Sequence, residues 1–200
     1  MINHTDLLNY LIGRFSLDSY CEIGTFNKDH NFNKIVCERK VCIDPDPNAK
    51  ADFVGTSDDF FSNNKELFSI LFIDGLHHAD QVKKDFENAL KCLAPGGFIV
   101  LHDCNPPTKA TTCVPRGSQR EWCGDVYKFA CRLQEYSGID FLTIDFDYGC
   151  AVVWRDPSKV GNSVGREITW EYFQQNRWLL RLTSVQKFLE VVEVGLIESN

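Results

Sequence analysis

Carboxylate and imidazole side chains follow the apolar segments of this sequence in a repeated pattern. Four apolar segments end in or beside an acidic residue, namely Glu22, Asp44, Asp74 and Asp103. Histidines stand close to two of these positions, as His77 and His102. A histidine ionises at about pH 6.5, which suits a general base, and carboxylates are preferred ligands of hard divalent cations. The pattern therefore indicates a site that removes a proton and that can hold a cation.

These residues must be positioned by the short apolar segments before them. Strands are predicted at 19–23, 40–43, 69–73 and 98–101, with a weaker one at 52–54. Residues 79–93 carry apolar side chains at helical spacing, and Pro95-Gly96-Gly97 ends that helix. Alternating strands and helices predict a parallel sheet with helices on both faces. Ligands of such sheets bind beyond the carboxyl ends of the strands, where the acidic residues fall.

The second half of the chain predicts a different pattern. The predicted segments are an irregular loop at 104–120, a helix at 122–136, strands at 141–146 and 149–154, and a helical region at 170–194. Little more than Asp147 and Tyr148 joins the two strands, which predicts an antiparallel hairpin. The apolar face of the last helical region either covers the sheet or pairs with a second subunit.

Composition excludes several classes of protein. The chain has 200 residues, 44% of them apolar and 24% charged, as expected for one globular domain. Its formal net charge of −7 opposes binding to nucleic acid. No apolar run approaches the roughly 18 residues needed to span a bilayer, and no signal peptide is recognisable, so we expect a cytoplasmic protein without a membrane partner. The nine cysteines form no CxxC pair, which indicates mostly structural thiols.

The turn after the first strand distinguishes between cofactors. A dinucleotide site requires a GxGxxG sequence, whereas Gly24 is followed by Thr25, Phe26, Asn27 and Lys28. Glu22 would repel a pyrophosphate but would suit a ligand with cationic groups. Asp44 follows Gly24 by about 20 residues, where a carboxylate can accept both hydroxyl hydrogens of a ribose. An adenosine with a cationic tail describes S-adenosylmethionine.

The sequence resembles class I S-adenosylmethionine-dependent methyltransferases, in particular methyltransferase family 24. The resemblance covers residues 18–155 and rests on YCEIGTFNKDHNF at 20–32, VCIDPDP at 41–47, GTSDDFF at 55–61, LFIDGLHHADQVKKDFENALKCLAPGGFIVLHDCNPP at 71–107, GDVYKF at 124–129 and DFDYGCAVV at 145–153. It implies a Rossmann-like α/β fold with a seven-stranded, mostly parallel sheet, an antiparallel C-terminal hairpin and helices on both faces. We expect one methyltransferase domain over 1–200, with its core at 18–155 and a helical C-terminal extension at 165–197.

The resemblance also implies roles for single residues. The methionine end of the cofactor is expected at Glu22, Gly24 and Thr25, its ribose at Asp44, and its adenine near Ser57 and Asp58, with Asp74 at the same edge. Lys28 departs from the pattern, because many relatives have a glycine there. In related oxygen methyltransferases the residue three positions after the strand-end carboxylate acts as the base, so His77 and Asp74 are the catalytic candidates.

A divalent cation is the second expected component. Asp74 and Asp103 would end neighbouring strands, and metal-dependent relatives hold Mg²⁺ or another divalent cation with this pair. The third ligand of the catechol-type pattern is replaced by Cys104, a poor ligand for Mg²⁺, and His102 would suit only a softer metal. Metal dependence therefore stays open at this point. Each of these histidines has a structural alternative, a hydrogen bond to a backbone carbonyl.

The acceptor is expected to be a sugar, nucleotide sugar or glycan precursor, because family members act on such molecules. Its hydroxyls would meet side chains around the same edge, namely Arg116, Trp122, Asp125 and Tyr148. The alternatives are a small phenolic acceptor, and a methyltransferase-like binding protein without turnover. The resemblance to the family further suggests a homodimer.

Overall fold

The computed structural model describes residues 3–193. Its strands are β1 (Ser19–Ile23), β2 (Arg39–Asp44), β3 (Phe53–Val54), β4 (Phe68–Ile73), β5 (Leu93–Leu101), β6 (Ile139–Ile144), β7 (Cys150–Arg155) and β8 (Leu182–Thr183). They form one sheet in the order β3-β2-β1-β4-β5-β7-β6-β8. The neighbouring pairs are parallel except those that β7 makes with β5 and β6. The expected α/β class, with its antiparallel hairpin, is confirmed.

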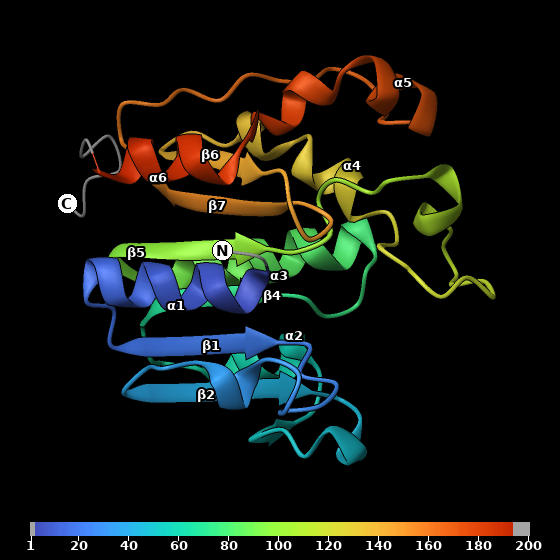
Figure 1. Ribbon diagram of the computed structural model, residues 1–200. Coiled ribbons are helices and arrows are strands. Elements are labelled where there is room, and N and C mark those ends of the chain that lie inside the picture. Colours follow the sequence, from blue (N-terminus) through green and yellow to red (C-terminus); the bar gives the residue numbers. More distant parts are fainter. Residues whose placement is uncertain (1–2, 194–200) are drawn as a thin grey trace.

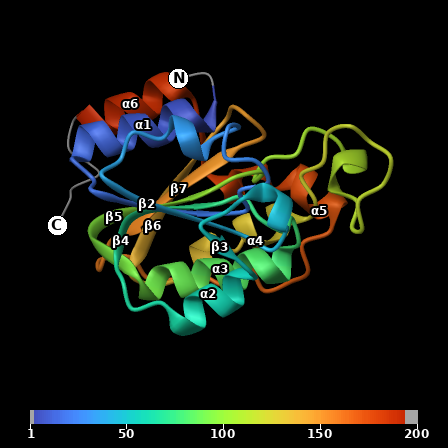
Figure 2. The same cartoon turned by 90° about the horizontal axis from the view of Figure 1, so that it is seen from below.

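Helices cover both faces of this sheet (Figures 1 and 2). One face carries α1 (His4–Phe15) and α6 (Val185–Glu193), and the other carries α2 (Ser57–Asn63), α3 (Ala79–Lys91), α4 (Val126–Ala130) and α5 (Trp170–Gln175). Side chains alternate along each strand, so Tyr20 and Phe72 pack under α1 while Ile23 and Ile73 pack toward α3. The two layers thus fix both faces of the central strands and leave their carboxyl ends open.

The order of strands turns at β1 and β4. From β1 the chain builds outward to β2 and β3, and then returns to place β4 on the other side of β1. In open α/β sheets a crevice forms where the order reverses in this way. The carboxyl ends of β1 and β4 are therefore the structural centre of the site.

The C-terminal region differs from the predicted run of helix at 170–194. Between α5 and α6 lie a short 3₁₀ helix, Arg177–Leu180, and strand β8, which pairs in parallel with β6. Arg181 adopts a left-handed backbone (φ 51°), which ends the helical path. The eighth strand gives hydrogen-bond partners to an edge that seven strands would leave open. Residues 194–197 of the predicted extension lie outside the described residues.

The helix predicted at 122–136 is also shorter in the structure. Gly124 has a φ of +59°, and a Cβ there would lie 1.8 Å from the carbonyl oxygen of His77. The close approach holds residues 122–125 in an irregular conformation, so α4 begins only at Val126. After α4 the chain continues as a 3₁₀ helix, Leu133–Glu135.

Further 3₁₀ helices occur at Phe32–Lys34, Pro47–Ala49 and Lys109–Thr112, the last within the irregular segment after β5. All nine cysteines are free thiols and most are buried, consistent with a structural role. No helix among residues 3–193 has the length and apolar character that crossing a bilayer requires.

Candidate active site

A cavity of about 630 Å³ opens at the carboxyl ends of β1, β2 and β4. Its walls include ten of the residues predicted from the sequence, namely Glu22, Gly24, Thr25, Asp44, Ser57, Asp58, Asp74, His77, Arg116 and Trp122. Gly24 has a φ of +89°, and a Cβ at this position would lie 2.2 Å from the carbonyl oxygen of Asp74. Only glycine permits the first turn to approach the end of β4 so closely.

Glu22 lies at the base of this cavity, almost fully buried, in a hydrogen-bonded group that the sequence did not reveal. Its Oε2 accepts hydrogen bonds from the hydroxyl of Tyr20 (2.5 Å) and from Nδ2 of Asn31 (2.6 Å). Burial raises the pKa of Glu22 to about 7, against the opposing effect of these two donors. A cationic group in the cavity would favour the ionised form of this carboxylate.

Asp44 is fixed by the backbone of the loops around it. Its Oδ2 accepts the N–H of Phe26 (2.7 Å), and its Oδ1 accepts the N–H of Asp46 (2.8 Å). Both oxygens keep a further lone pair, so the carboxylate can still accept hydroxyl hydrogens from a ligand.

The neighbouring wall of the cavity is set by α2 and α3. Ser57 donates its hydroxyl hydrogen to the buried carboxylate of Asp85 (2.6 Å), and Gln81 contacts Ser57, Asp58 and Asp85 through Nε2. Because these bonds join the two helices, the wall beside Asp58 is rigidly held.

Lys28 does not enter the cavity. Its ammonium group forms an ion pair with Asp52 and lies 5.1 Å from the ring centroid of Phe32. The residue that replaces the family's second glycine is therefore directed to the outside of the first turn. It also makes no pair with Glu22, which is bound by Tyr20 and Asn31 instead.

His77 joins the cavity to the segment after β5. Its Nδ1 lies 3.0 Å from the carbonyl oxygen of Trp122, and the two rings stack with centroids 4.9 Å apart. Nδ1 also lies 3.1 Å from Asp103 Oδ2, and Nε2 lies 3.5 Å from Asp74 Oδ1. Burial would lower the pKa of His77, but these carboxylates outweigh it and raise the pKa above its ordinary value. The imidazole is thus held as a proton acceptor whose charged form is stabilised.

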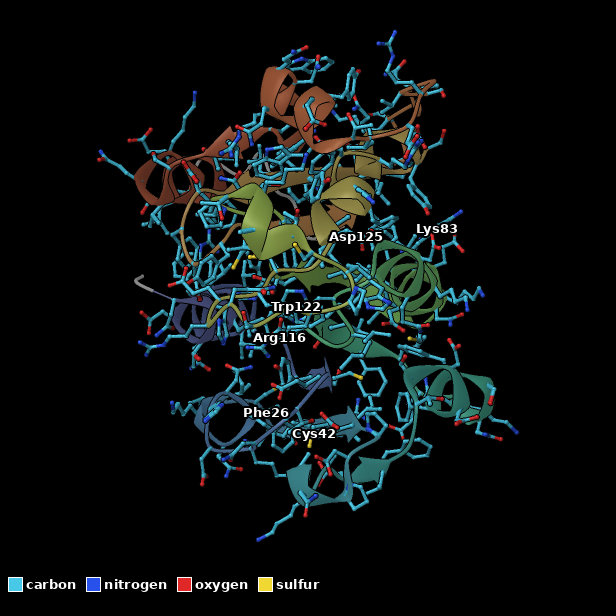
Figure 3. All side chains as sticks on the ribbon, turned by 90° about the vertical axis from the view of Figure 1, so that its right-hand side faces the viewer. Phe26, Cys42, Lys83, Arg116, Trp122 and Asp125 are labelled. Atoms are coloured by element: carbon cyan, nitrogen blue, oxygen red, sulfur yellow. The ribbon has the colours of Figure 1, made fainter. Side chains whose placement is uncertain are left out.

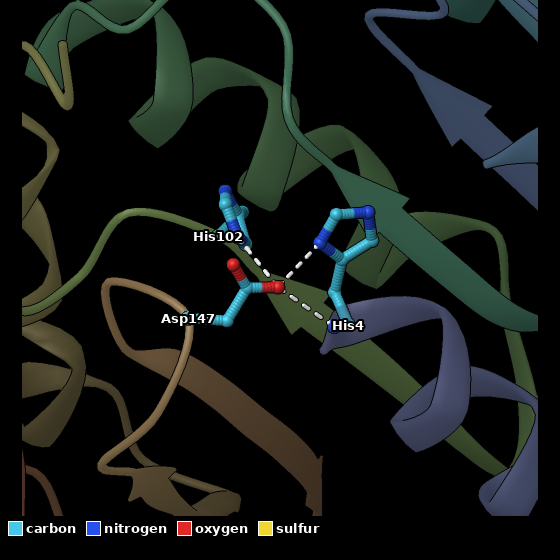
Figure 4. A group of neighbouring side chains, drawn as sticks. All are labelled: His4, His102 and Asp147. Atoms are coloured by element: carbon cyan, nitrogen blue, oxygen red, sulfur yellow. Dashed lines mark hydrogen bonds and ion pairs between the residues drawn. The ribbon is translucent and has the colours of Figure 1, made fainter. Parts of the chain in front are cut away.

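His102 lies between three carboxylates. Its Nδ1 is 3.1 Å from Asp74 Oδ1 and 3.6 Å from Asp103 Oδ2, while its Nε2 is 3.6 Å from Asp147 Oδ2. Asp147 in turn accepts hydrogen bonds from the backbone N–H of His4 (2.8 Å) and from its ring (2.7 Å), as Figure 4 shows. The group joins the start of α1, the end of β5 and the tip of the β6–β7 hairpin.

The donor atoms at the end of β5 are not those that Mg²⁺ prefers. Asp74 and Asp103 converge as the sequence predicted, but the third group between them is the imidazole of His102. Mg²⁺ takes oxygen ligands in octahedral geometry, whereas a mixed nitrogen and oxygen set suits first-row transition metals. Cys104 offers no ligand, because its buried Sγ faces the carbonyl oxygens of Leu101 and His102.

The four predicted acceptor residues fall into two groups. Arg116 and Trp122 line the cavity, and the guanidinium of Arg116 lies 5.6 Å from the Trp122 ring centroid. Asp125 instead accepts the N–H of Ala79 at the start of α3 (2.7 Å) and lines a separate groove. Tyr148 forms the hairpin turn with Asp147 and is not among the lining residues. Figure 3, which looks onto the carboxyl ends of the strands, shows Arg116 and Trp122 together and Asp125 farther toward α3.

One protein-family model matches part of the chain. Residues 19–104 match methyltransferase family 24, described as a methyltransferase domain. This segment, less than half of the chain, is therefore similar to a methyltransferase domain. The match begins at β1 and ends one residue after Asp103, so it includes the first turn and the four strand-end carboxylates, and also His77 and His102.

Solved structures share the fold of this chain. They include the O-methyltransferase TomG from Streptomyces achromogenes in complex with S-adenosylmethionine (TM-score 0.53, 18% identity, 76% of this chain and 78% of that chain covered). A Staphylococcus aureus protein assigned as a caffeoyl-CoA O-methyltransferase aligns equally well (TM-score 0.53, 18% identity, 76% and 82% covered). The N-methyltransferase NodS from Bradyrhizobium japonicum WM9 aligns with a TM-score of 0.50 (20% identity, 78% and 94% covered). A comparison of the sequence with curated proteins finds no match.

Several polar residues of the candidate site were not predicted from the sequence, among them Tyr20, Asn31 and His4. Tyr20 and Asn31 bind Glu22, and His4 reaches the site from the first helical residue of the chain. Tyr20 stands two residues before Glu22 on the same strand, a spacing that places both on one face and could have indicated the pair. His4 and Asn31 carry no such local signal: the packing of α1 on the sheet brings His4 there, and the path of the loop after β1 brings Asn31 there.

Proposed function

We propose that this methyltransferase transfers a methyl group from S-adenosylmethionine to a hydroxyl of a small molecule, with a phenolic hydroxyl as the preferred acceptor. The observation that carries the proposal is a single cavity that is lined by the strand-end carboxylates Glu22, Asp44 and Asp74 and also by His77. Among the described residues that line it, Arg116 is the one Lys or Arg. Such a cavity suits a cofactor with a cationic tail.

The residues of the cavity fit the parts of the cofactor. Glu22 would face the amino group of its methionine end, and Gly24 and Thr25 provide the turn along which that end lies. Asp44 would accept the ribose hydroxyls, and the wall of Ser57 and Asp58 would border the adenine. S-adenosylmethionine supplies an electrophilic methyl group on a sulfonium, so the protein has only to align the acceptor and remove its proton.

His77 is the proposed general base. The carbonyl oxygen of Trp122 can only accept, so a neutral His77 would carry its proton on Nδ1 and leave Nε2, which lies 3.5 Å from Asp74 Oδ1, unprotonated. Nε2 would take the proton of the acceptor hydroxyl. The resulting imidazolium is stabilised by Asp103 at 3.1 Å and Asp74 at 3.5 Å.

A phenolic acceptor is favoured over the sugar expected from the sequence. The structural relatives include a protein assigned as a caffeoyl-CoA O-methyltransferase. A phenol also loses its proton more readily than a sugar hydroxyl, which suits a single histidine base. Arg116 beside Trp122 would face the acceptor.

The experiment is a methyl-transfer assay with labelled S-adenosylmethionine on panels of phenols and of nucleotide sugars. Transfer to phenols that falls at least 100-fold in His77→Ala, with S-adenosylhomocysteine binding kept, supports the proposal. Transfer to sugars alone contradicts the phenolic acceptor. Cofactor binding without transfer to any member of either panel favours a binding protein without turnover.

A further inference from the structure

Arg116 brings a positive charge to a cavity whose other charged walls are acidic. The carboxylates that line this cavity are Glu22, Asp44, Asp58, Asp74 and Asp85. Within residues 3–193, Arg116 forms no ion pair with a carboxylate, and its one hydrogen bond runs from Nη2 to the carbonyl oxygen of Arg120 (3.1 Å). A guanidinium carries five N–H donors, so most of them, and the full positive charge, remain for a ligand.

The guanidinium of Arg116 is held close to the proposed base through one aromatic ring. Its central carbon lies 5.6 Å from the ring centroid of Trp122, and the Trp122 ring stacks on His77 with centroids 4.9 Å apart. Nε1 of Trp122 donates a hydrogen bond to the carbonyl oxygen of Cys113 (2.6 Å), which fixes the indole. The guanidinium is therefore no farther from the imidazole than roughly the sum of the two centroid distances. One small molecule can thus contact Arg116 and His77 together.

The charges of the cavity indicate which kind of ligand this guanidinium binds. A neutral phenol offers Arg116 no ionic partner, and the cationic groups of the cofactor would be repelled by it. An anionic acceptor would be repelled by the carboxylates of the cavity unless a cation offsets them. The paired N–H groups of a guanidinium match two oxygens of a carboxylate or a phosphate, which binds such an anion in one orientation. Arg116 therefore has the chemistry to select an acidic acceptor.

We infer that Arg116, held by Trp122, binds an anionic group of the acceptor, a carboxylate or a phosphate, while the acceptor hydroxyl meets His77. The inference rests on the proposed function and deepens it, because it restricts the acceptors to phenols that carry an acid a short distance from the hydroxyl. The cofactor brings one further anion, the carboxylate of its methionine end, which the proposed function assigns to the first turn. Binding of the acceptor is measurable without turnover, so the anion site has its own test.

The test is calorimetric titration of the full chain, with and without S-adenosylhomocysteine, using matched pairs of phenols. Caffeate is compared with its methyl ester, and hydroquinone monophosphate with hydroquinone, so that a carboxylate and a phosphate are tested separately. We expect at least one acid to bind about 10- to 100-fold more tightly than its neutral partner, and Arg116→Gln to abolish this preference. Lys109→Gln is the matched control, because it removes a positive charge from the same segment outside the cavity. It should keep the preference.

The inference is overturned if neither acid binds more tightly than its neutral partner, or if Arg116→Gln keeps the preference. Weakening of S-adenosylhomocysteine binding by more than about 10-fold in Arg116→Gln also overturns it, because the guanidinium would then bind the carboxylate of the cofactor. Arg116 is exposed, so its replacement leaves the core intact.

Methyl transfer to the same phenols separates the anion site from the proposed function. Transfer to acids and neutral phenols alike, without a preference that depends on Arg116, overturns the anion site alone. Binding of an acid that depends on Arg116, without transfer to any phenol, supports the anion site and contradicts the proposed reaction.

Discussion

The ring of His77 stacks on Trp122 at an interplanar angle of 15°, while its Nδ1 lies 3.0 Å from the carbonyl oxygen of that same residue. One residue therefore fixes both the plane of the imidazole and the nitrogen that carries its proton. Gly124 packs against the backbone of His77, and Asp125 donates its N–H to the His77 carbonyl oxygen (3.1 Å). The segment after β5 thus acts as the support of the proposed base.

Replacing the indole should reduce turnover without removing the cofactor site. We expect Trp122→Leu to lower kcat about 10-fold, because His77 loses the ring that orients it, while the affinity for S-adenosylhomocysteine stays within about 2-fold. Trp122→Phe should recover much of the loss. The control is Trp178→Leu, whose side chain is 65% exposed on the C-terminal region. An unchanged kcat in Trp122→Leu would contradict the positioning role.

Asp44 should determine cofactor affinity. Asp44→Asn replaces an oxygen that accepts backbone N–H groups and that would accept ribose hydroxyls, so we expect binding of S-adenosylhomocysteine to weaken by about 10- to 100-fold. Asp46→Asn is the matched control, because Asp46 belongs to the same loop but does not line the cavity. Calorimetric titration measures both. Equal affinities for the two variants would place the ribose elsewhere.

The first turn tolerates only glycine at position 24. In Gly24→Ala the new Cβ would meet the backbone of Asp74 and Gly75 at 2.2–2.3 Å, in a backbone conformation that alanine disfavours. We expect a loss of at least about 2 kcal/mol in the free energy of unfolding. Gly13→Ala provides the opposite control, since no atom lies within 4 Å of its Cβ and α1 continues through it. It should stabilise the protein by about 0.5–1 kcal/mol. Urea denaturation measures the free energy of unfolding of both variants, which should change in opposite directions.

Residues close in sequence to a strand end could be predicted, and those that depend on distant packing could not. Glu22, Asp44 and Asp74 follow from the carboxyl ends of parallel strands, and the cavity lies where they meet. Asp125 was predicted at the acceptor side, yet it caps α3. The neighbouring sequence does not indicate that Gly124 packs against His77. Nor does it indicate that the carboxylate of Asp125 accepts the N–H of Ala79 and does not line the cavity.

The features that the sequence did not predict have the same physical origin. The contact of His4 with Asp147 joins residues 143 positions apart, and no local pattern encodes it. The short strand β8 interrupts an amphipathic run that predicts helix, because pairing with the open edge of β6 outweighs the helical periodicity. The His4–Asp147 contact and the strand β8 both depend on the tertiary arrangement of the folded sheet, which the local sequence does not contain.

Glu22 should make stability depend on pH. Its pKa is about 7 in the folded protein against an ordinary value of 4.5, because burial disfavours the charged form. The contribution of Glu22 to stability is therefore fully present below about pH 4.5 and is lost as the pH rises through about 7. Glu22→Gln cannot ionise, so we expect it to gain about 3 kcal/mol relative to the wild type between pH 4.5 and pH 8. Urea denaturation across this range measures the difference. If the difference in the free energy of unfolding between wild type and Glu22→Gln stays constant with pH, the raised pKa of Glu22 is contradicted.

The most direct test of the methyltransferase assignment is calorimetric titration of the full chain with S-adenosylhomocysteine, with NAD⁺ titrated in parallel. The cavity predicts one molecule of S-adenosylhomocysteine per chain, bound in the micromolar range, and no binding of NAD⁺, because the carboxylate of Glu22 lines the cavity and would repel a pyrophosphate. Absence of S-adenosylhomocysteine binding by the folded protein, or NAD⁺ binding of equal strength, would contradict the proposed function.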